Sequence, residues 1–271
     1  MAAARSLPGD TPSLDAQVLL AHVVGRTRAW VLAHGEDPVD ASQAAAYERL
    51  LTRLKQGEPL AYLTGRQEFY GLTFRVSPVV LIPRPETELL VERALAWLQE
   101  NQGIRRAADI GTGSGCIAVT LAAHIPDLRL IASDRSLQAL RLARENARLH
   151  GVLDRTTFIQ ADLLSPFQRP MALDLICANL PYIPTSTLAQ LPVRRWEPAL
   201  ALDGGEDGLT LIRRLLKGAQ DRLSPGGLVL LEIEAGQGEA ACRLAREAFP
   251  GAKVSLYQDL ARLDRIVQIE T

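Results

Sequence analysis

The pattern of hydrophobic and polar residues changes character along the chain near Gly71. Between Ser13 and Lys55 the apolar residues recur at helical spacing, and no stretch alternates as a strand does. This spacing predicts several short packed helices, with Ser13 and Asp40 as candidate caps. Glycines and prolines mark the expected helix ends, at Gly35, Pro38, Gly57 and Pro59.

An aromatic and β-branched segment follows, from Phe69 to Val76, with a glycine near its centre. We expect two short strands joined by a turn. Next, Pro83-Arg84-Pro85-Glu86-Thr87-Glu88 opens a helix over Leu89 to Leu98, because proline suits a helix start and acids oppose the positive end of the helix dipole. These changes predict an N-terminal helical domain over residues 1–66, a β-hairpin linker over 67–82 and a second domain over 83–271.

From Ala107 onward, short apolar strands alternate with helices of about 10 to 15 residues, a pattern typical of a parallel α/β sheet. The segment from Tyr257 to Leu263 is too short for a helical crossover, so the final strand should run antiparallel to its neighbour. Seven strands are expected, at residues 107–110, 128–133, 156–160, 173–178, 227–234, 252–256 and 264–270.

Composition and charge exclude several classes of protein. Apolar residues make up 47% of the chain and charged residues 23%, as in ordinary globular domains. Lys and Arg number 30 against 31 Asp and Glu, so no overall positive field exists to hold nucleic acid or an anionic membrane. We therefore expect no direct nucleic-acid partner and no membrane association.

The compartment and the metal content also follow from the residue pattern. Residues 1–12 lack the apolar stretch of a secretory signal, and no apolar run reaches the length of a membrane span. The three cysteines, Cys116, Cys177 and Cys242, are far apart and form no C-x-x-C pair. The histidines have no metal-like spacing. These features predict a cytoplasmic protein without disulfides or a bound metal.

A glycine-rich turn, Asp109-Ile110-Gly111-Thr112-Gly113-Ser114-Gly115, leaves the first strand of the sheet and enters a helix at Cys116. Its spacing is G-x-G-x-G, which matches neither the dinucleotide fingerprint nor the phosphate-binding P-loop. A nucleoside cofactor without phosphates fits better. Asp134, at the end of the second strand, is placed to accept hydrogen bonds from ribose hydroxyls, and Asp162, after the third, from an adenine amino group.

Each of these features has a purely structural alternative. The glycines could form only a tight turn, and each aspartate could cap a helix. However, the three features lie at the ends of three successive strands, and in open α/β sheets that edge is where ligands bind. Their convergence favours a cofactor site.

The fourth strand ends in Asn179-Leu180-Pro181-Tyr182, which resembles the Asn-Pro-Pro-Tyr motif of methyltransferases that use S-adenosylmethionine to methylate an amide or exocyclic amino nitrogen. Leu180 stands where that motif has its first proline. An amide nitrogen is a poor nucleophile, so it must be held with its lone pair aimed at the methyl group. The Asn179 side-chain oxygen and the Leu180 carbonyl can each accept one amide hydrogen, while Tyr182 packs over the flat group. The alternative is an ordinary proline-containing loop.

Five segments in order are similar to the HemK/PrmC family, which methylates the glutamine of the Gly-Gly-Gln loop in peptide chain release factors. They are Phe69 to Gly71, Leu81 to Glu88, Asp109 to Gly115, Asn179 to Tyr182 and Trp196 to Gly208. The resemblance covers nearly the whole chain. It implies a seven-stranded, Rossmann-like class I methyltransferase sheet with its last strand antiparallel, preceded by a small helical domain and a hairpin.

The resemblance also implies S-adenosylmethionine as cofactor and release factors as protein substrate. Asn179, Leu180, Pro181 and Tyr182 would hold the substrate glutamine for transfer to its N5 atom. By the same resemblance, the cofactor would be bound by Gly111, Thr112, Gly113, Ser114, Gly115, Asp134, Leu163 and Asn179. Asp109 and Asp162, which lie at strand ends beside them, complete the predicted cofactor site.

A DNA adenine-N6 methyltransferase is the main alternative, because such enzymes share the glycine turn and an Asn-x-Pro-Tyr motif. Enzymes that flip bases need a basic surface to hold the duplex. Residues 1–75 carry eight basic and eight acidic residues, so the extra domain is neutral. A silent binding protein with the same fold is a further alternative. The preferred release factor, the role of the N-terminal helices and the oligomeric state stay open.

Overall fold

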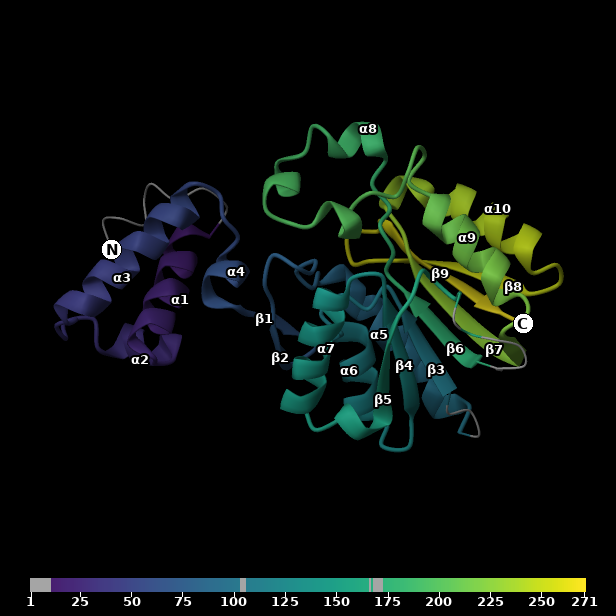
Figure 1. Ribbon diagram of the computed structural model, residues 1–271, viewed down its shortest axis with the longest axis horizontal. Coiled ribbons are helices and arrows are strands. Elements are labelled where there is room, and N and C mark those ends of the chain that lie inside the picture. Colours follow the sequence, from purple (N-terminus) through teal and green to yellow (C-terminus); the bar gives the residue numbers. More distant parts are fainter. Residues whose placement is uncertain (1–10, 103–105, 166, 168–172) are drawn as a thin grey trace. The chain divides into compact units, whose positions relative to one another are not determined.

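The structure is a computed structural model that describes residues 11–102, 106–165, 167 and 173–271 (Figure 1). The chain divides into two compact units, Met1–Arg66 and Gln67–Thr271. Residues 1–10 of the expected N-terminal domain lie outside the described residues.

The first unit is helical, as the spacing of its apolar residues predicted. Asp40 caps its longest helix by accepting hydrogen bonds from the backbone nitrogens of Ser42 and Gln43. The prediction that Ser13 is a cap is wrong, because the first helix begins one residue earlier, at a proline that suits the first helical position. The helices are α1 (Pro12–Val24), α2 (Arg28–Ala33), α3 (Ala41–Lys55) and α4 (Leu60–Thr64). Their shared core contains Ala16, Leu19, Leu51, Leu54 and Leu63.

Two short strands, β1 (Arg66–Phe69) and β2 (Leu72–Arg75), form the predicted hairpin. Tyr70 and Gly71 make its turn, and both have positive φ, +50° and +72°. Two such residues match the right-handed twist of the paired strands. Phe74 is fully buried in the core of the second unit, so packing secures the hairpin there.

The second unit contains a seven-stranded sheet in the order β5-β4-β3-β6-β7-β9-β8. The seven predicted strands are confirmed. Strand β9 runs antiparallel to both neighbours, because residues 259–263 can form only a tight connection after β8. The strands are β3 (Arg106–Ile110), β4 (Arg129–Asp134), β5 (Thr156–Gln160), β6 (Leu173–Ala178), β7 (Leu223–Glu232), β8 (Lys253–Gln258) and β9 (Asp264–Glu270).

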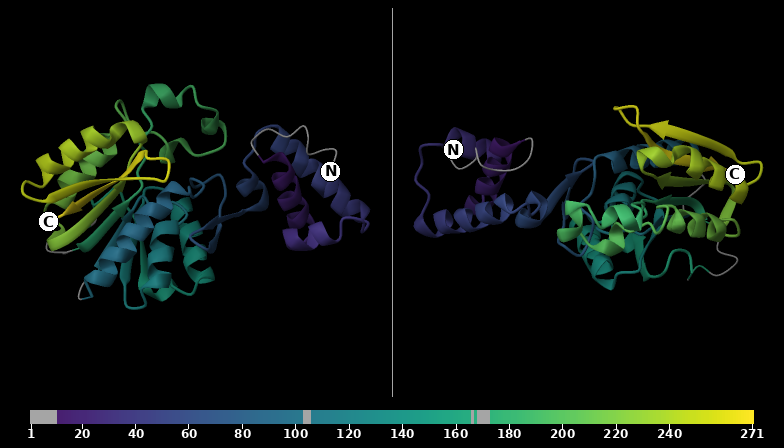
Figure 2. Two further views of the ribbon diagram at one scale, coloured as in Figure 1. Left: turned by 180° about the vertical axis from the view of Figure 1, so that it is seen from behind. Right: turned by 90° about the horizontal axis from the view of Figure 1, so that it is seen from above.

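Helices cover both faces of this sheet (Figures 1 and 2). Successive strand residues point to opposite faces and join two separate hydrophobic clusters. One face is covered by α5 (Glu86–Glu100), α6 (Cys116–His124) and α7 (Leu137–Leu149), the other by α9 (Thr210–Ala219) and α10 (Gly238–Ala248). Among the described residues, no helix combines the length and apolar character that crossing a membrane requires.

A long segment connects β6 to α9 beside the carboxyl ends of the strands (Figure 1). It folds back on itself where Ile183 pairs with Asp203 and the Gly204 nitrogen donates to the Ile183 carbonyl at 2.8 Å. The short helices of the unit are η2 (Leu153–Arg155), α8 (Thr185–Leu188), η3 (Pro192–Arg195), η4 (Ala199–Ala201) and η5 (Ala235–Gln237).

Candidate active site

A cavity of about 350 Å³ opens at the carboxyl ends of β3, β4, β5 and β6. This is the edge at which open α/β sheets bind ligands. The predicted site residues that line it are Gly111, Thr112, Gly113, Ser114, Asp134, Asp162, Leu163, Asn179, Leu180 and Pro181. Three predicted residues, Asp109, Gly115 and Tyr182, do not line the cavity.

The glycine turn has a backbone that other residues rarely adopt. Gly111, Gly113 and Gly115 have φ of +77°, +54° and +82°. A Cβ on Gly111 would lie 3.0 Å from Leu180 Cδ2, and one on Gly115 would lie 3.1 Å from Ala143 Cβ. Leu180 is itself buried, so its side chain packs the Asn-Leu-Pro-Tyr loop directly onto the glycine turn.

Asp109 supports the turn from beneath. Its Oδ2 accepts hydrogen bonds from Thr112 Oγ1 at 2.6 Å and from the Ala118 nitrogen at 3.2 Å. Its Oδ1 has no hydrogen-bond partner among the described residues. Complete burial raises the pKa of this carboxyl to about 7, although its hydrogen bonds act in the opposite direction.

Asp134 connects the turn to the start of α7. Its carboxylate accepts from the Gly113 nitrogen at 2.9 Å and from the Ser136 nitrogen at 2.8 Å. The cap of α7 is Ser136, which accepts from Ala139, so Asp134 is not the helix cap. Burial raises the pKa of Asp134, and each carboxylate oxygen keeps a lone pair for a further donor at the cavity wall.

Asp162 and Leu163 form the third part of the cavity wall. Asp162 Oδ2 pairs with Arg214 Nη2 at 2.8 Å, and this hydrogen bond lowers the pKa of the carboxyl. Its Oδ1 is buried and has no partner among the described residues. Leu163 has a φ of +53°, which costs energy for a residue with a side chain. The packed surroundings therefore hold this backbone in a strained shape at the cavity.

A hydrogen bond to helix α5 anchors the side-chain amide of Asn179. Its Nδ2 donates to Thr87 Oγ1 at 3.0 Å, across 92 residues of sequence. Thr87 lies in the first turn of α5 and is buried. Because this bond uses the nitrogen, the amide oxygen Oδ1 is available to another donor.

Backbone contacts fix the rest of the loop. Gln237 Nε2 donates to the Tyr182 carbonyl at 3.0 Å, and a Cβ on Gly204 would lie 2.8 Å from the Pro181 carbonyl oxygen. These contacts and the packing of Leu180 hold the loop without the first proline of the motif. Burial raises the pKa of the Tyr182 phenol to about 12, so it stays protonated at neutral pH.

Sequence reasoning gave no role to an ion pair beside the cavity. Arg84 lines the cavity, and its Nη2 lies 2.5 Å from Glu197 Oε1. Glu197 is buried, and its Oε2 also accepts from the Ile82 nitrogen at 3.1 Å. This pair joins two of the family-like segments, Leu81 to Glu88 and Trp196 to Gly208, beside the cavity.

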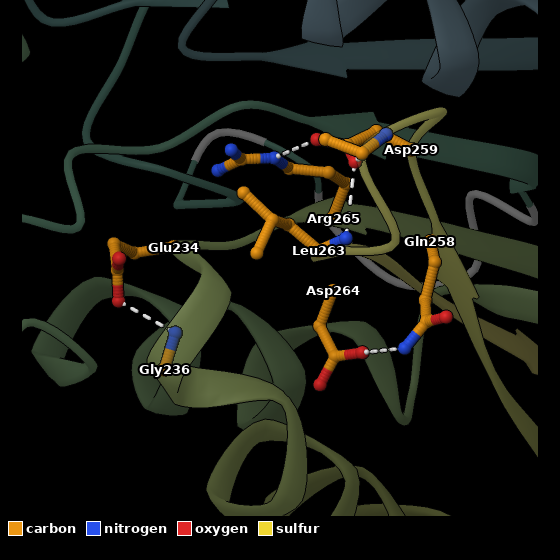
Figure 3. Close-up of polar contacts among 8 residues, drawn as sticks. Glu234, Gly236, Gln258, Asp259, Leu263, Asp264 and Arg265 are labelled. Atoms are coloured by element: carbon orange, nitrogen blue, oxygen red, sulfur yellow. Dashed lines mark hydrogen bonds and ion pairs between the residues drawn. The ribbon is translucent and has the colours of Figure 1, made fainter.

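Arg265 is a second cationic side chain that the sequence did not single out. Asp259 holds it with an Nε–Oδ2 distance of 2.8 Å and also accepts from the Leu263 nitrogen (Figure 3). Arg265 lies close enough to Tyr182 and Glu86 for its charge to act on both. Asp259, in the connection between β8 and β9, therefore holds the guanidinium group of the β9 residue Arg265 near the motif tyrosine.

Comparison with known proteins places the chain in a family. Residues 3–65 match the model described as the PrmC N-terminal domain, and residues 86–191 match the methyltransferase small domain. A release factor glutamine methyltransferase from Moorella thermoacetica is 45% identical, covering 94% of this chain and 90% of the relative. This chain belongs to the release factor glutamine methyltransferase family. Another member, from Bordetella pertussis, is 44% identical, and the alignment covers 94% of this chain and 93% of that relative.

Solved structures of more distant proteins share the fold of this family member. A ribosomal protein L11 methylase from Lactobacillus delbrueckii subsp. bulgaricus aligns with a TM-score of 0.51 at 18% identity, covering 75% of this chain and 88% of its own. A T. Thermophilus 16S rRNA N2 G1207 methyltransferase, solved with AdoMet and guanosine, aligns with a TM-score of 0.55 at 19% identity, covering 76% and 49%. At these identities the likeness concerns the fold.

Proposed function

We propose that this protein transfers the methyl group of S-adenosylmethionine to the side-chain nitrogen N5 of the glutamine in the Gly-Gly-Gln loop of peptide chain release factors. One observation carries the proposal. Asn179, Leu180 and Pro181 line the same cavity as the glycine turn and Asp134. An amide-holding motif and a nucleoside cradle therefore share one site, in a chain whose relatives are named for this reaction.

The residues present fit S-adenosylmethionine. Asp134 offers carboxylate lone pairs for the two ribose hydroxyls, and the buried Asp162 Oδ1 offers an acceptor for the adenine amino group. The volume of the cavity lies in the range usual for cofactor sites. The glycine turn and Leu163 complete the wall. Asp109 and Gly115, at the two ends of the turn, do not line the cavity but stabilise the turn, Asp109 by accepting from Thr112 and Gly115 by its close approach to Ala143. When bound, the cofactor supplies an electrophilic methyl group on a positively charged sulfur.

The chain's own residues would orient the nucleophile. An amide nitrogen is a poor nucleophile because its lone pair is delocalised into the carbonyl, so it must be held with that lone pair toward the methyl group. Asn179 Oδ1 and the Leu180 carbonyl would accept one N–H each, which fixes the NH₂ group and stabilises the positive charge that grows on nitrogen as the N–C bond forms and the S–C bond breaks. One of the two N–H protons is then lost to water, which leaves a neutral methylated amide. Pro181 shapes the loop. Tyr182 does not line the cavity, so the predicted packing of its ring on the substrate amide is replaced by a supporting role, with its carbonyl held by Gln237.

The protein partner would be recognised outside the cavity. A glutamine side chain presents few atoms, so choosing one glutamine among many requires a wider contact surface. We assign residues 1–66 to a helical domain, 67–82 to a hairpin linker and 83–271 to the methyltransferase domain. The partner belongs to the translation apparatus, so we place the reaction in the cytoplasm.

The names of the curated relatives support glutamine rather than adenine as the substrate, which sets aside the DNA adenine-N6 alternative. The test is mass spectrometry of a purified release factor incubated with this protein and S-adenosylmethionine. We expect one added methyl group on the Gly-Gly-Gln glutamine. An adenine-containing duplex is treated in parallel, and methylation of the duplex alone would overturn the proposal.

A further inference from the structure

Glu232, the last residue of β7, is a charged side chain in a place where charge is costly. It is 2% exposed and ends a strand whose preceding residues are apolar and buried. Burying an ionised carboxyl without compensation is strongly unfavourable. A residue kept in such a position therefore needs a compensating interaction or a function.

The sheet register brings Glu232 beside the amide-holding motif. Leu231 of β7 pairs with Ala178 of β6 in parallel register. Glu232 is the last residue of β7, and Asn179 is the first residue after β6. Both therefore lie at the same edge of the sheet, on neighbouring strands. Thr87 reaches this point from α5, and hydrogen bonding from Thr87 and Asn179 acts on the Glu232 carboxyl.

The direction of the hydrogen bond between Asn179 and Thr87 fixes which end of the Asn179 amide faces α5. Asn179 Nδ2 donates to Thr87 Oγ1 at 3.0 Å, which leaves the hydroxyl hydrogen of Thr87 free to donate to Glu232. Asn179 also lowers the pKa of the Glu232 carboxyl, as an N–H donor close to a carboxylate does. A reversed amide would place Oδ1, in place of Nδ2, beside Thr87 and the neighbouring negative charge of the Glu232 carboxylate.

We propose that Glu232 is a positioning residue for methyl transfer, whose carboxylate, together with Thr87, holds the Asn179 amide with Nδ2 inward and Oδ1 toward the substrate nitrogen. The inference rests on the proposed function and adds a residue to its mechanism. Glu232 Oε2 has no hydrogen-bond partner among the described residues. The buried carboxyl is therefore incompletely compensated, which favours a role in orienting Asn179 over a purely structural one.

The surrounding charges are consistent with a carboxyl that is difficult to ionise. Burial raises the pKa of Glu232 to about 7, with Glu86 adding to the rise and Arg265 opposing it. Assays at pH 8 therefore examine the ionised form. Protonation would let the carboxyl donate to Asn179 Oδ1, and the amide would lose its preferred direction.

The test compares single-turnover methylation of a release factor at pH 8 and saturating cofactor. Glu232→Gln keeps the shape but can donate as well as accept, so we expect the rate to fall about 10-fold, the effect of losing one hydrogen bond to a charged group. Cofactor affinity and the KM for release factor should stay within about threefold of wild type by the same reasoning. Asp174→Asn is the matched control, since Asp174 lies at the opposite end of β6 and accepts from Ser224 and Arg106.

An exchange of charges separates positioning from structural support. Asn179→Asp alone places two carboxylates together and should lower the rate about 100-fold or more. In the double variant Asn179→Asp with Glu232→Gln, the glutamine donates to the aspartate, so we expect at least about a tenfold recovery over Asn179→Asp. A purely structural role predicts that the rate recovers only as far as the melting temperature does, whereas positioning predicts recovery of the rate between variants of equal melting temperature.

The outcomes separate the inference from the proposed function. A wild-type protein that binds the cofactor but leaves the release factor unmethylated would overturn both. An active wild type with a normal Glu232→Gln rate, or with no recovery in the double variant, would overturn only the role of Glu232.

Discussion

Replacing Asp134 tests the cofactor site most directly. In the structure its carboxylate accepts two backbone hydrogen bonds, from Gly113 and Ser136, and presents its remaining lone pairs to the cavity. Asp134→Ala removes a charged acceptor for the ribose hydroxyls. A hydrogen bond to a charged group contributes about 1.5 to 3 kcal/mol, so the Kd for S-adenosylmethionine should rise about 10- to 150-fold.

Asp134→Asn is the informative comparison, because it keeps the size and one acceptor oxygen. We expect an intermediate Kd in isothermal titration calorimetry. Asp134→Ala should also lower the melting temperature, since two backbone donors lose their acceptor, and circular dichroism must show that the variant remains folded at the titration temperature. Wild-type affinity in a folded Asp134→Ala protein would refute the ribose assignment and leave this residue with only its role in the turn.

Three further results are expected. At saturating cofactor, Asn179→Ala should lower the single-turnover rate about 10²- to 10³-fold, as in losses of other preorganised transition-state contacts, and a near-normal rate would contradict the mechanism. Burial raises the pKa of Glu232 from its ordinary value of 4.5 to about 7, so between these pH values the folded protein keeps a proton that the unfolded chain releases. The free energy of unfolding therefore falls as the pH rises from 4.5 to about 7. Glu232→Gln removes this loss, and its melting temperature should exceed that of wild type more at pH 8 than at pH 4.5; an equal difference at both would show that the carboxyl is not strained. Intact release factor should be a far better substrate than a short Gly-Gly-Gln peptide, and Leu32→Glu, at an exposed apolar position of α2, should weaken only the former if the helical unit contacts the partner. Comparable kcat/KM values for wild type on both substrates would place all recognition in the cavity.

Local chemistry in the sequence was sufficient to predict the fold. The central strands β6 and β7 contain short apolar runs, and the tight connection before the last strand dictated its reversed direction. The Gly-x-Gly-x-Gly spacing predicted a turn that needs positive φ, and Gly111, Gly113 and Gly115 all have it. These features depend on neighbours in the chain, which is why they can be read without coordinates.

Contacts between distant segments were decided only by the tertiary structure. Glu232 resembles any acid at a strand end until the register of β7 on β6 places it beside Asn179. Thr87 and Asn179 meet across 92 residues, and Arg84 meets Glu197 across 113. Periodicity describes which face of an element is buried but not which side chains meet there, because packing of whole elements sets those distances. The sequence therefore determined the fold and the motifs of the site, while the sheet register and the packing of α5 determined the surroundings of the reacting amide.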